Sequence, residues 1–231
     1  MTIEPRETLT RKLQKHYDDI LKLSSMVEDS ILASVETLRE QDFSKAKAVY
    51  EKDEQINEIR YEIEHAALTT VATQQPIASD LRKVSSVIDI SGELERIGDY
   101  AKGIARITLR IGKEEPLTSL DSISKMAELT ADMLHRAITA FLNLDEQTAL
   151  AIVDEDDLVD ELYNQHYHKL LEIMFNDRET IDQATFYLWV SHNLERAADR
   201  VTNICERVVF TSSGELVEFD RSDDEIEDKK I

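Results

Sequence analysis

The amino-acid sequence predicts an all-α protein built as two pseudo-symmetric three-helix bundles from a tandem repeat. The chain has only 5 Gly and 3 Pro among 231 residues, far fewer turn-forming residues than the roughly 12% of average usage. Between these breakers, apolar residues recur at the three- and four-residue spacing of helices. The chain also resembles itself after a shift of about 100 residues. The small number of Gly and Pro residues and the sustained helical periodicity argue against an all-β sandwich or barrel.

Three helices are expected in the first repeat. Apolar positions mark the first helix between residues 26 and 38, and the second between residues 49 and 67. The segment Thr73-Gln74-Gln75-Pro76 ends the second helix. Pro76 is expected to begin the third helix, because the missing N–H of proline costs nothing in a first helical turn. The third helix continues to the break at residues 112–116.

Three further helices are expected in the second repeat. The fourth begins near Thr118 and includes Phe141, and Asp145 caps the fifth. The sixth helix follows the break at residues 176–178, and Gly214 ends it. Helices of about 26 to 35 residues exceed the globular average, so the predicted bundles are elongated.

The internal repeat defines the expected domain organisation. A shift of 103 residues places Asp53 on Asp156, and a shift of 100 residues places residues 94–99 on residues 194–199. A period this long indicates a duplicated domain rather than a solenoid of many units. The expected units are a first repeat over residues 7–112, a second over 117–214, and an acidic, disordered tail over 215–231.

The charge balance restricts the classes of partner. The chain has 27 Lys and Arg against 48 Asp and Glu, which gives a formal charge of −21. An acidic surface repels a phosphate backbone, so nucleic acid is not expected as a partner. Cations and basic protein faces suit such a surface better.

Cysteine usage and hydropathy indicate a compartment. The single Cys205 cannot form an internal disulfide, and the first twelve residues carry charges where a signal peptide has an apolar core. The longest apolar stretch, residues 149–153, is far shorter than the roughly 18 residues that span a bilayer. We therefore expect a soluble, cytoplasmic protein without direct membrane insertion, which reaches the inner membrane face only through partners.

Acidic side chains share one stripe beside the core face of the sixth predicted helix. At 100° per residue this stripe holds His192, Glu195, Asp199 and Glu206. The third predicted helix carries Glu95 and Asp99 on the matching stripe, together with Gly92, Lys102 and Arg106. Repeat two thus keeps three carboxylates and a histidine where repeat one brings in two cations.

The fifth and second predicted helices carry acidic residues of their own. Asp156 and Asp160 are four residues apart and share one helix face, while Asp53 and Asn57 occupy the equivalent positions in repeat one. Carboxylates that converge from two helices repel each other unless they bind protons or a cation. Oxygen ligands with some imidazole suit Fe, Mn, Mg or Zn. Ordinary surface ion pairs with Arg96, Arg196 and Arg200, each worth under about 1 kcal/mol, are the alternative explanation of the same spacing.

Several segments resemble the PhoU family of bacterial and archaeal phosphate-specific transport accessory proteins. The resemblance covers residues 7–216. It is carried by residues 80–84 (DLRKV), residues 94–101 (LERIGDYA), residues 194–210 (LERAADRVTNICERVVF) and the ending at residues 214–216 (GEL). The resemblance implies two pseudo-symmetric three-helix bundles, in agreement with the internal repeat.

The resemblance also implies a metal site, a role and partners. Family members bind iron or zinc clusters through paired Glu/Asp-x-x-x-Asp motifs, which fall here on Glu95 with Asp99, Glu195 with Asp199, and Asp156 with Asp160, while Asn57 replaces the acid expected after Asp53. The implied role is repression of the phosphate-starvation response and restraint of phosphate uptake. The implied partners are the ATPase subunit of the phosphate transporter and a phosphate-sensing histidine kinase. A homodimer is a further expectation.

The two repeats are not equivalent as metal sites. Repeat two offers His192, Glu206 and an intact Asp156 and Asp160 pair, whereas repeat one has Lys102, Arg106 and Asn57. We therefore expect repeat two to hold metal more tightly.

The remaining candidate residues favour structural roles. His166 lies on an apolar helix face and is expected to be a packed core histidine, and Cys205 is expected to act as a small hydrophobic residue. The sequence has no Gly-rich phosphate loop, no nucleophile elbow and no two Glu-x-x-His motifs of the di-iron oxidase kind. The chain is thus not expected to be an enzyme. The alternatives are a carboxylate-bridged metal enzyme on a helical bundle, or a purely structural helical scaffold.

Overall fold

The computed structural model describes residues 5–219 of the chain, and these residues form six long helices and no strand. The elements are α1 (Pro5–Glu40), α2 (Phe43–Gln74), α3 (Ser79–Ile111), α4 (Asp121–Asn143), α5 (Glu146–Asn176), the short 3-10 helix η1 (Arg178–Thr180) and α6 (Ile181–Ser213). The all-α prediction is confirmed. Most of the predicted acidic tail, residues 220–231, lies outside the described residues.

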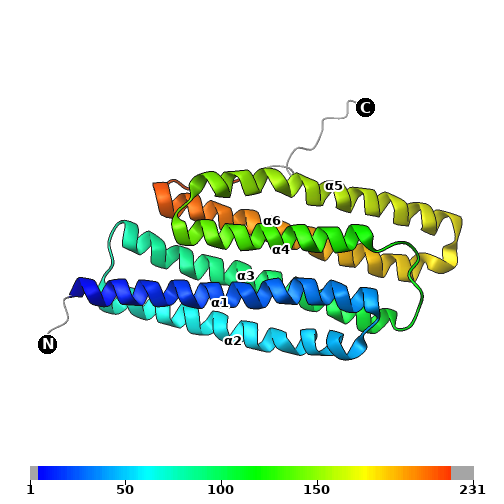
Figure 1. Ribbon diagram of the computed structural model, residues 1–231, viewed down its shortest axis with the longest axis horizontal. Coiled ribbons are helices and arrows are strands. Elements are labelled where there is room, and N and C mark those ends of the chain that lie inside the picture. The colour runs from blue at the N-terminus through cyan, green and yellow to red at the C-terminus, as the bar shows by residue number, and fades with distance from the viewer. Residues whose placement is uncertain (1–4, 220–231) are drawn as a thin grey trace.

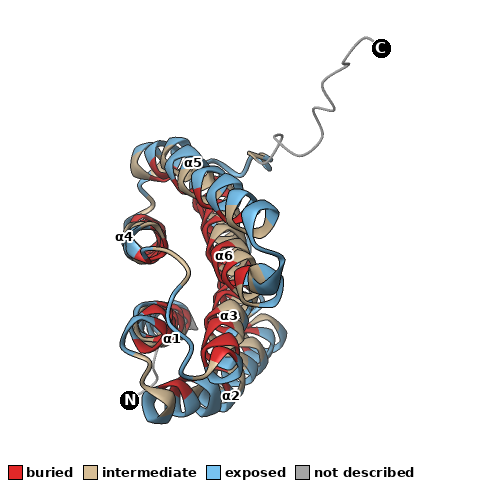
Figure 2. Ribbon diagram, turned by 90° about the vertical axis from the view of Figure 1, so that its right-hand side faces the viewer, coloured by how far each residue is buried: buried red, intermediate tan, exposed pale blue. Residues whose placement is uncertain are grey.

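The helices run along one axis as two three-helix bundles placed side by side (Figure 1). Viewed along that axis, α2, α3, α6 and α5 form one curved layer, and α1 and α4 lie on its concave side (Figure 2). Helix α1 packs on α2 and α3, helix α4 packs on α5 and α6, and α3 packs on α6 at the centre. The predicted pair of pseudo-symmetric bundles is therefore confirmed, and the α3–α6 contact joins them.

Helix boundaries follow local capping chemistry in both repeats. The carboxylates of Asp42 and Asp145 accept hydrogen bonds from the backbone N–H groups of Lys45 and Thr148, at 3.0 and 3.1 Å, so the predicted N-cap Asp145 is confirmed and Asp42 caps α2 in the same way. Gly214 follows α6 in the left-handed conformation, with φ of 86°, which suits glycine at a helix C-terminus.

Two predicted helix starts are wrong. Helix α3 begins at Ser79 rather than at Pro76, because the chain first turns through Ala78, which takes a φ of 48°. Helix α4 begins at Asp121 rather than near Thr118, because Ser119 Oγ accepts the N–H of Asp121 and so caps the first turn from outside the helix. Helix α4 is consequently only 23 residues long, whereas α1 extends to 36.

One apolar core runs through both bundles, and it includes the two residues expected there. His166 and Cys205 are buried, with 2% and 0% of their surface exposed. Trp189 is more than half exposed on the outer side of α6. No helix among the described residues is both long enough and apolar enough to cross a bilayer.

Candidate metal-binding site

A cluster of carboxylates lies where α5 faces α6 in the second bundle. Asp160 projects from α5, and Glu195 and Asp199 project from successive turns of α6. Each offers a carboxylate oxygen within 4.8 Å of the others, and all three side chains are half-buried. We call Asp156, Asp160, Glu195 and Asp199 the α5–α6 acidic cluster. The structure thus brings together the acids that were predicted from the stripe on the sixth helix and from the four-residue spacing of Asp156 and Asp160.

Asp156 is the most perturbed member of the α5–α6 acidic cluster. Its Oδ1 atom is buried and has no hydrogen-bond partner among the described residues. Burial, and then the charges of the neighbouring carboxylates Asp199, Asp160 and Glu195, together raise the pKa of Asp156 to about 8. A buried carboxylate surrounded by like charges is stabilised by a proton or by a metal ion, so the environment of Asp156 fits a cation.

His192 and Arg196 flank the cluster on α6. His192 Nδ1 lies 3.2 Å from Glu195 Oε2, and Arg196 Nη1 lies 2.8 Å from Asp199 Oδ2. Burial, and then the charge of Arg196, lower the pKa of His192, which keeps the imidazole neutral at pH 7 and able to coordinate a cation. Tyr163 of α5 packs against the His192 ring at 6.3 Å between ring centroids.

Ordinary ion pairs, the alternative explanation of the spacing of these acids, account for part of the arrangement, since Arg196 pairs with Asp199. Arg96 pairs with Glu93 at 3.0 Å, and Arg200 lies 3.6 Å from the same Glu93. Arg196 therefore partly neutralises the cluster, and Arg96 and Arg200 both lie against the same acid on α3.

Glu206 lies apart from the cluster, although it shares the stripe predicted from the sequence. It is two helical turns beyond Asp199, about 10 Å along the axis. Its Oε1 accepts the backbone N–H of Phe219 at 3.0 Å, so the chain after α6 folds back along this helix. Residues 215–219 of the predicted disordered tail therefore include a segment that packs on α6.

The equivalent place in the first bundle has a different composition. Asp53 of α2 is buried, and its Oδ2 accepts hydrogen bonds from Lys102 Nζ at 2.5 Å and from Asn57 Nδ2 at 3.0 Å. Lys102 Nζ also lies 3.6 Å from Asp99 Oδ1. Burial raises the pKa of both Glu95 and Asp99, and neighbouring carboxylates add to the effect, with Asp99 acting on Glu95 and Asp53 acting on Asp99. The structure thus brings Asp53, Glu95 and Asp99 together, with an ammonium group among them.

Two contributions to these sites could not be found from the sequence stripe. Lys102 is on the stripe, but its contact with Asp53 crosses from α3 to α2. Tyr163, which contacts His192 and lies near Glu195, follows Asp160 by three residues and carried no recognised motif. Both contacts depend on the axial register between neighbouring helices.

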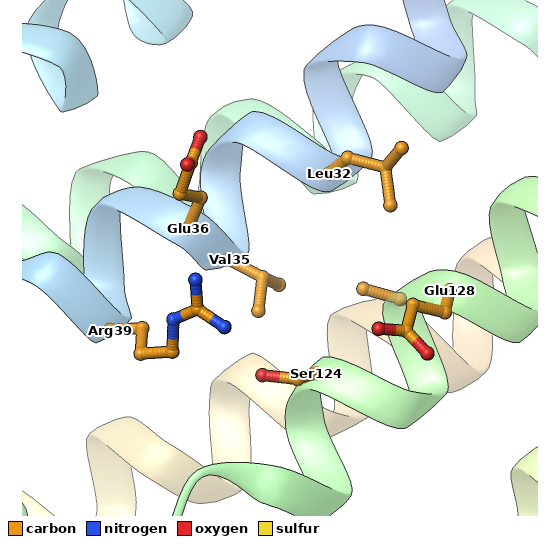
Figure 3. A pocket seen from close by; sticks show the side chains of 7 residues that line it. Leu32, Val35, Glu36, Arg39, Ser124 and Glu128 are labelled. Atoms are coloured by element: carbon orange, nitrogen blue, oxygen red, sulfur yellow. The ribbon is translucent and has the colours of Figure 1, made fainter.

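At least one hollow on the surface of the described residues lies apart from the cluster. One of about 290 Å³ lies between α1 and α4 and is lined by Leu32, Val35, Glu36, Arg39, Ser124, Ala127 and Glu128 (Figure 3). None of these seven residues belongs to the predicted metal-ligand set. The chemistry that this structure offers most clearly is therefore oxygen coordination of a cation between α5 and α6, with His192 as an adjacent nitrogen donor.

Comparison with known proteins agrees with both the repeat and the fold. A family model described as the PhoU domain matches the chain twice, over residues 20–108 and 123–208. The phosphate-specific transport system accessory protein PhoU homolog of Clostridium acetobutylicum is 32% identical over 93% of this chain and 98% of that protein. The PhoU homolog of Caulobacter vibrioides is 34% identical over 85% of this chain and 86% of that protein.

Solved structures give the same result. The phosphate transport system regulatory protein PhoU from Streptococcus pneumoniae superposes with a TM-score of 0.85 at 30% identity, covering 91% of this chain and 99% of that chain. PhoU from Pseudomonas aeruginosa gives a TM-score of 0.85 at 28% identity, covering 89% and 99%. These relatives are named as accessory or regulatory proteins rather than as enzymes, in agreement with the expectation of a non-catalytic protein. The chain therefore belongs to the PhoU family.

Proposed function

We propose that this chain is a cytoplasmic regulator of phosphate uptake and of the phosphate-starvation response. It acts through protein contacts with the ATPase subunit of a phosphate transporter and with a phosphate-sensing histidine kinase. The supporting observation is membership of the PhoU family along both repeats, since the relatives are named as accessory proteins of phosphate-specific transport. A regulator that works by contact needs an extended surface rather than a reaction pocket, and the two elongated bundles provide one (Figure 1).

We further propose that the α5–α6 acidic cluster binds a metal ion, with iron and zinc as the first candidates. Asp156, Asp160, Glu195 and Asp199 would hold it, and His192 is within reach as a nitrogen ligand. The buried, unpartnered Oδ1 atom of Asp156 is the observation that most favours a cation here. When bound, the ion neutralises the repulsion among these carboxylates and links α5 to α6.

A pull-down tests the regulatory part. The purified chain is mixed with the cytoplasmic subunits of a phosphate transporter and with the kinase, with metal and after chelation. We expect one or both to be retained, and the amount retained to depend on metal. Absence of binding to either partner under both conditions would remove the proposed role. Binding that ignores metal would support regulation by contact but contradict its dependence on metal, whereas a purely structural helical scaffold predicts neither metal dependence nor any effect on phosphate uptake.

Metal analysis of two matched double variants tests the site. Glu195→Ala/Asp199→Ala removes two carboxylates from the second bundle, and Glu95→Ala/Asp99→Ala removes the equivalent pair from the first. We expect the greater loss of bound metal from the second-bundle variant. A greater loss from the first-bundle variant would contradict the assignment. Hydrolytic or oxygen-dependent turnover that disappears with the metal would instead support the carboxylate-bridged enzyme alternative.

A further inference from the structure

In the first bundle, the position that a bound cation would take is filled by a side chain of the protein. The ammonium group of Lys102 lies 2.5 Å from Asp53 Oδ2 and 3.6 Å from Asp99 Oδ1, so it bridges α2 and α3. The same ammonium group lies 5.6 Å from the centre of the Tyr50 ring, a further favourable contact for a cation. Carboxylates on one side and an aromatic ring on the other are the surroundings that stabilise a positive charge.

We propose that Lys102 is a tethered cation that replaces a metal ion between α2 and α3, so that only the second bundle of this chain keeps an open metal site. Lys102 would exclude a metal ion from the first bundle whether or not the second bundle binds one. One metal site in place of two differs from the pair of sites that the family motifs imply.

One carboxylate oxygen of Asp53 is already engaged in the first bundle, while its buried Oδ1 has no hydrogen-bond partner among the described residues. Asn57 Nδ2 donates to both the side chain and the backbone oxygen of Asp53, at 3.0 and 3.1 Å, so the amide presents hydrogens to this site rather than its oxygen. Asp53 Oδ2 therefore accepts hydrogen bonds from both Lys102 and Asn57. A metal ion would have to displace both hydrogen-bond donors to use this oxygen, and both donors stay at high local concentration because they are tethered to the chain.

The hydrogen bond from Lys102 to Asp53 raises the pKa of the lysine, so the ammonium remains charged across the physiological range. A divalent ion approaching Asp53 would meet this fixed positive charge at contact distance. Counting Lys102, the set with Asp53, Glu95 and Asp99 carries a formal charge of −2 when ionised. The α5–α6 acidic cluster, with four acids and the Arg196 that pairs with Asp199, carries −3 when ionised.

The second bundle lacks a lysine at the equivalent position. Thr202 aligns with Lys102, and its Oγ1 donates to the backbone oxygen of Asp199 in its own helix at 2.8 Å. Thr202 therefore contributes no charge to the α5–α6 acidic cluster. Asp160 aligns with Asn57 and supplies a carboxylate in place of an amide. The two positions that close the first site are thus both reversed in the second.

A titration with Mn²⁺ tests the proposal, since this ion prefers the oxygen ligands present here. Bound Mn²⁺ is counted by calorimetry and by electron paramagnetic resonance for the full chain, Lys102→Met, and Lys102→Met/Asn57→Asp. Met keeps the length of the side chain and removes the charge. Lys52→Met is the matched control, because Lys52 is equally exposed at 31% and, although it directly precedes Asp53, its ammonium group forms an ion pair with Asp29 of α1.

We expect Lys102→Met to bind one more Mn²⁺ than the unmodified chain, with an affinity at the first bundle at least tenfold higher. The added substitution Asn57→Asp should raise that affinity further. Adding Glu95→Ala/Asp99→Ala should remove the gained ion, and Lys52→Met should change nothing. Should Lys102→Met not fold, Lys102→Gln, which keeps a hydrogen-bond donor, takes its place.

An unchanged number of ions in both Lys102 variants would overturn the proposal, as would two sites of similar affinity in the unmodified chain. If the unmodified chain binds no ion and Lys102→Met binds one, the tethered cation is supported while the proposed second-bundle metal site fails. The two proposals are therefore separable in one experiment.

Discussion

Replacing His166 with isoleucine should remove part of the acid sensitivity of this protein. His166 of α5 is buried, and its Nε2 has no hydrogen-bond partner among the described residues. Burial, and then the charge of Lys169, lower the pKa of His166 to about 4 from its usual 6.5. Ile63 occupies the equivalent position of α2 and is also buried, so the first repeat shows that isoleucine fits such a site.

The magnitude follows from the difference between the folded and unfolded pKa values. Above pH 6.5 the imidazole is neutral in both states and has no effect on stability. As pH falls from 6.5 towards 4, the unfolded chain takes up a proton that the folded chain refuses, so the free energy of unfolding falls. At about 1.4 kcal/mol per pKa unit, the loss reaches about 2 kcal/mol at pH 5 and about 3 kcal/mol below pH 4.

Thermal unfolding at pH 7 and pH 5 measures this effect. In a chain of this size, 1 kcal/mol corresponds to roughly 2 to 4 °C, so the unfolding temperature of the unmodified chain should fall about 4 to 8 °C further than that of His166→Ile. Comparing the two proteins cancels the acid sensitivity of His16, whose pKa is also lowered by burial, because both proteins contain it. The exposed neighbour His168 provides the control His168→Gln, which should behave as the unmodified chain. Equal falls for His166→Ile and the unmodified chain would refute the reasoning.

Two further predictions concern the acidic cluster and the helix caps. Asp156→Asn should raise the unfolding temperature of the metal-free, chelated protein, and the gain should grow as pH rises from about 4 to 8, because the folded pKa of Asp156 lies above its unfolded value. The same substitution should reduce the increase in unfolding temperature that added metal causes. An equal gain at all pH values in a series of melting curves would contradict this prediction. Asp42→Ala and Asp145→Ala should each lower the free energy of unfolding by about 1 kcal/mol in urea titrations, since each removes one N-cap hydrogen bond, and a loss in only one repeat would show that the caps are not equivalent.

The fold was predictable because its determinants are local or periodic. Asp42, Asp145 and Gly214 act through the backbone next to them, so their effect can be recognised from the sequence itself. The start of α3 could not be predicted in this way. It depends on a positive φ at Ala78, a conformation that alanine seldom adopts and that the surrounding chain imposes.

The sequence predicted on which face of each helix the site residues lie, but not which residues of neighbouring helices lie at the same level along the bundle axis. A helical wheel places Glu195, Asp199 and Glu206 on one stripe, yet it gives no axial register between neighbouring helices. Only Glu195 and Asp199 are level with Asp160, whereas Glu206 is level with the chain that follows α6. For the same reason Lys102 could be recognised as a cation on the stripe, but not as the partner of Asp53.

The two bundles illustrate how a duplicated domain can acquire different dependences on solution conditions. In the first bundle, the carboxylates between α2 and α3 are neutralised by Lys102, which is present whenever the chain is folded. In the second, Thr202 stands at the position equivalent to Lys102, and Arg196 offsets part of the charge through its ion pair with Asp199. A dissolved cation stabilises a folded state by an amount that rises with the logarithm of its concentration relative to its dissociation constant, whereas a tethered one contributes a constant amount. Under the proposal that Lys102 occupies the first site, a response to metal should therefore be confined to the α5–α6 half.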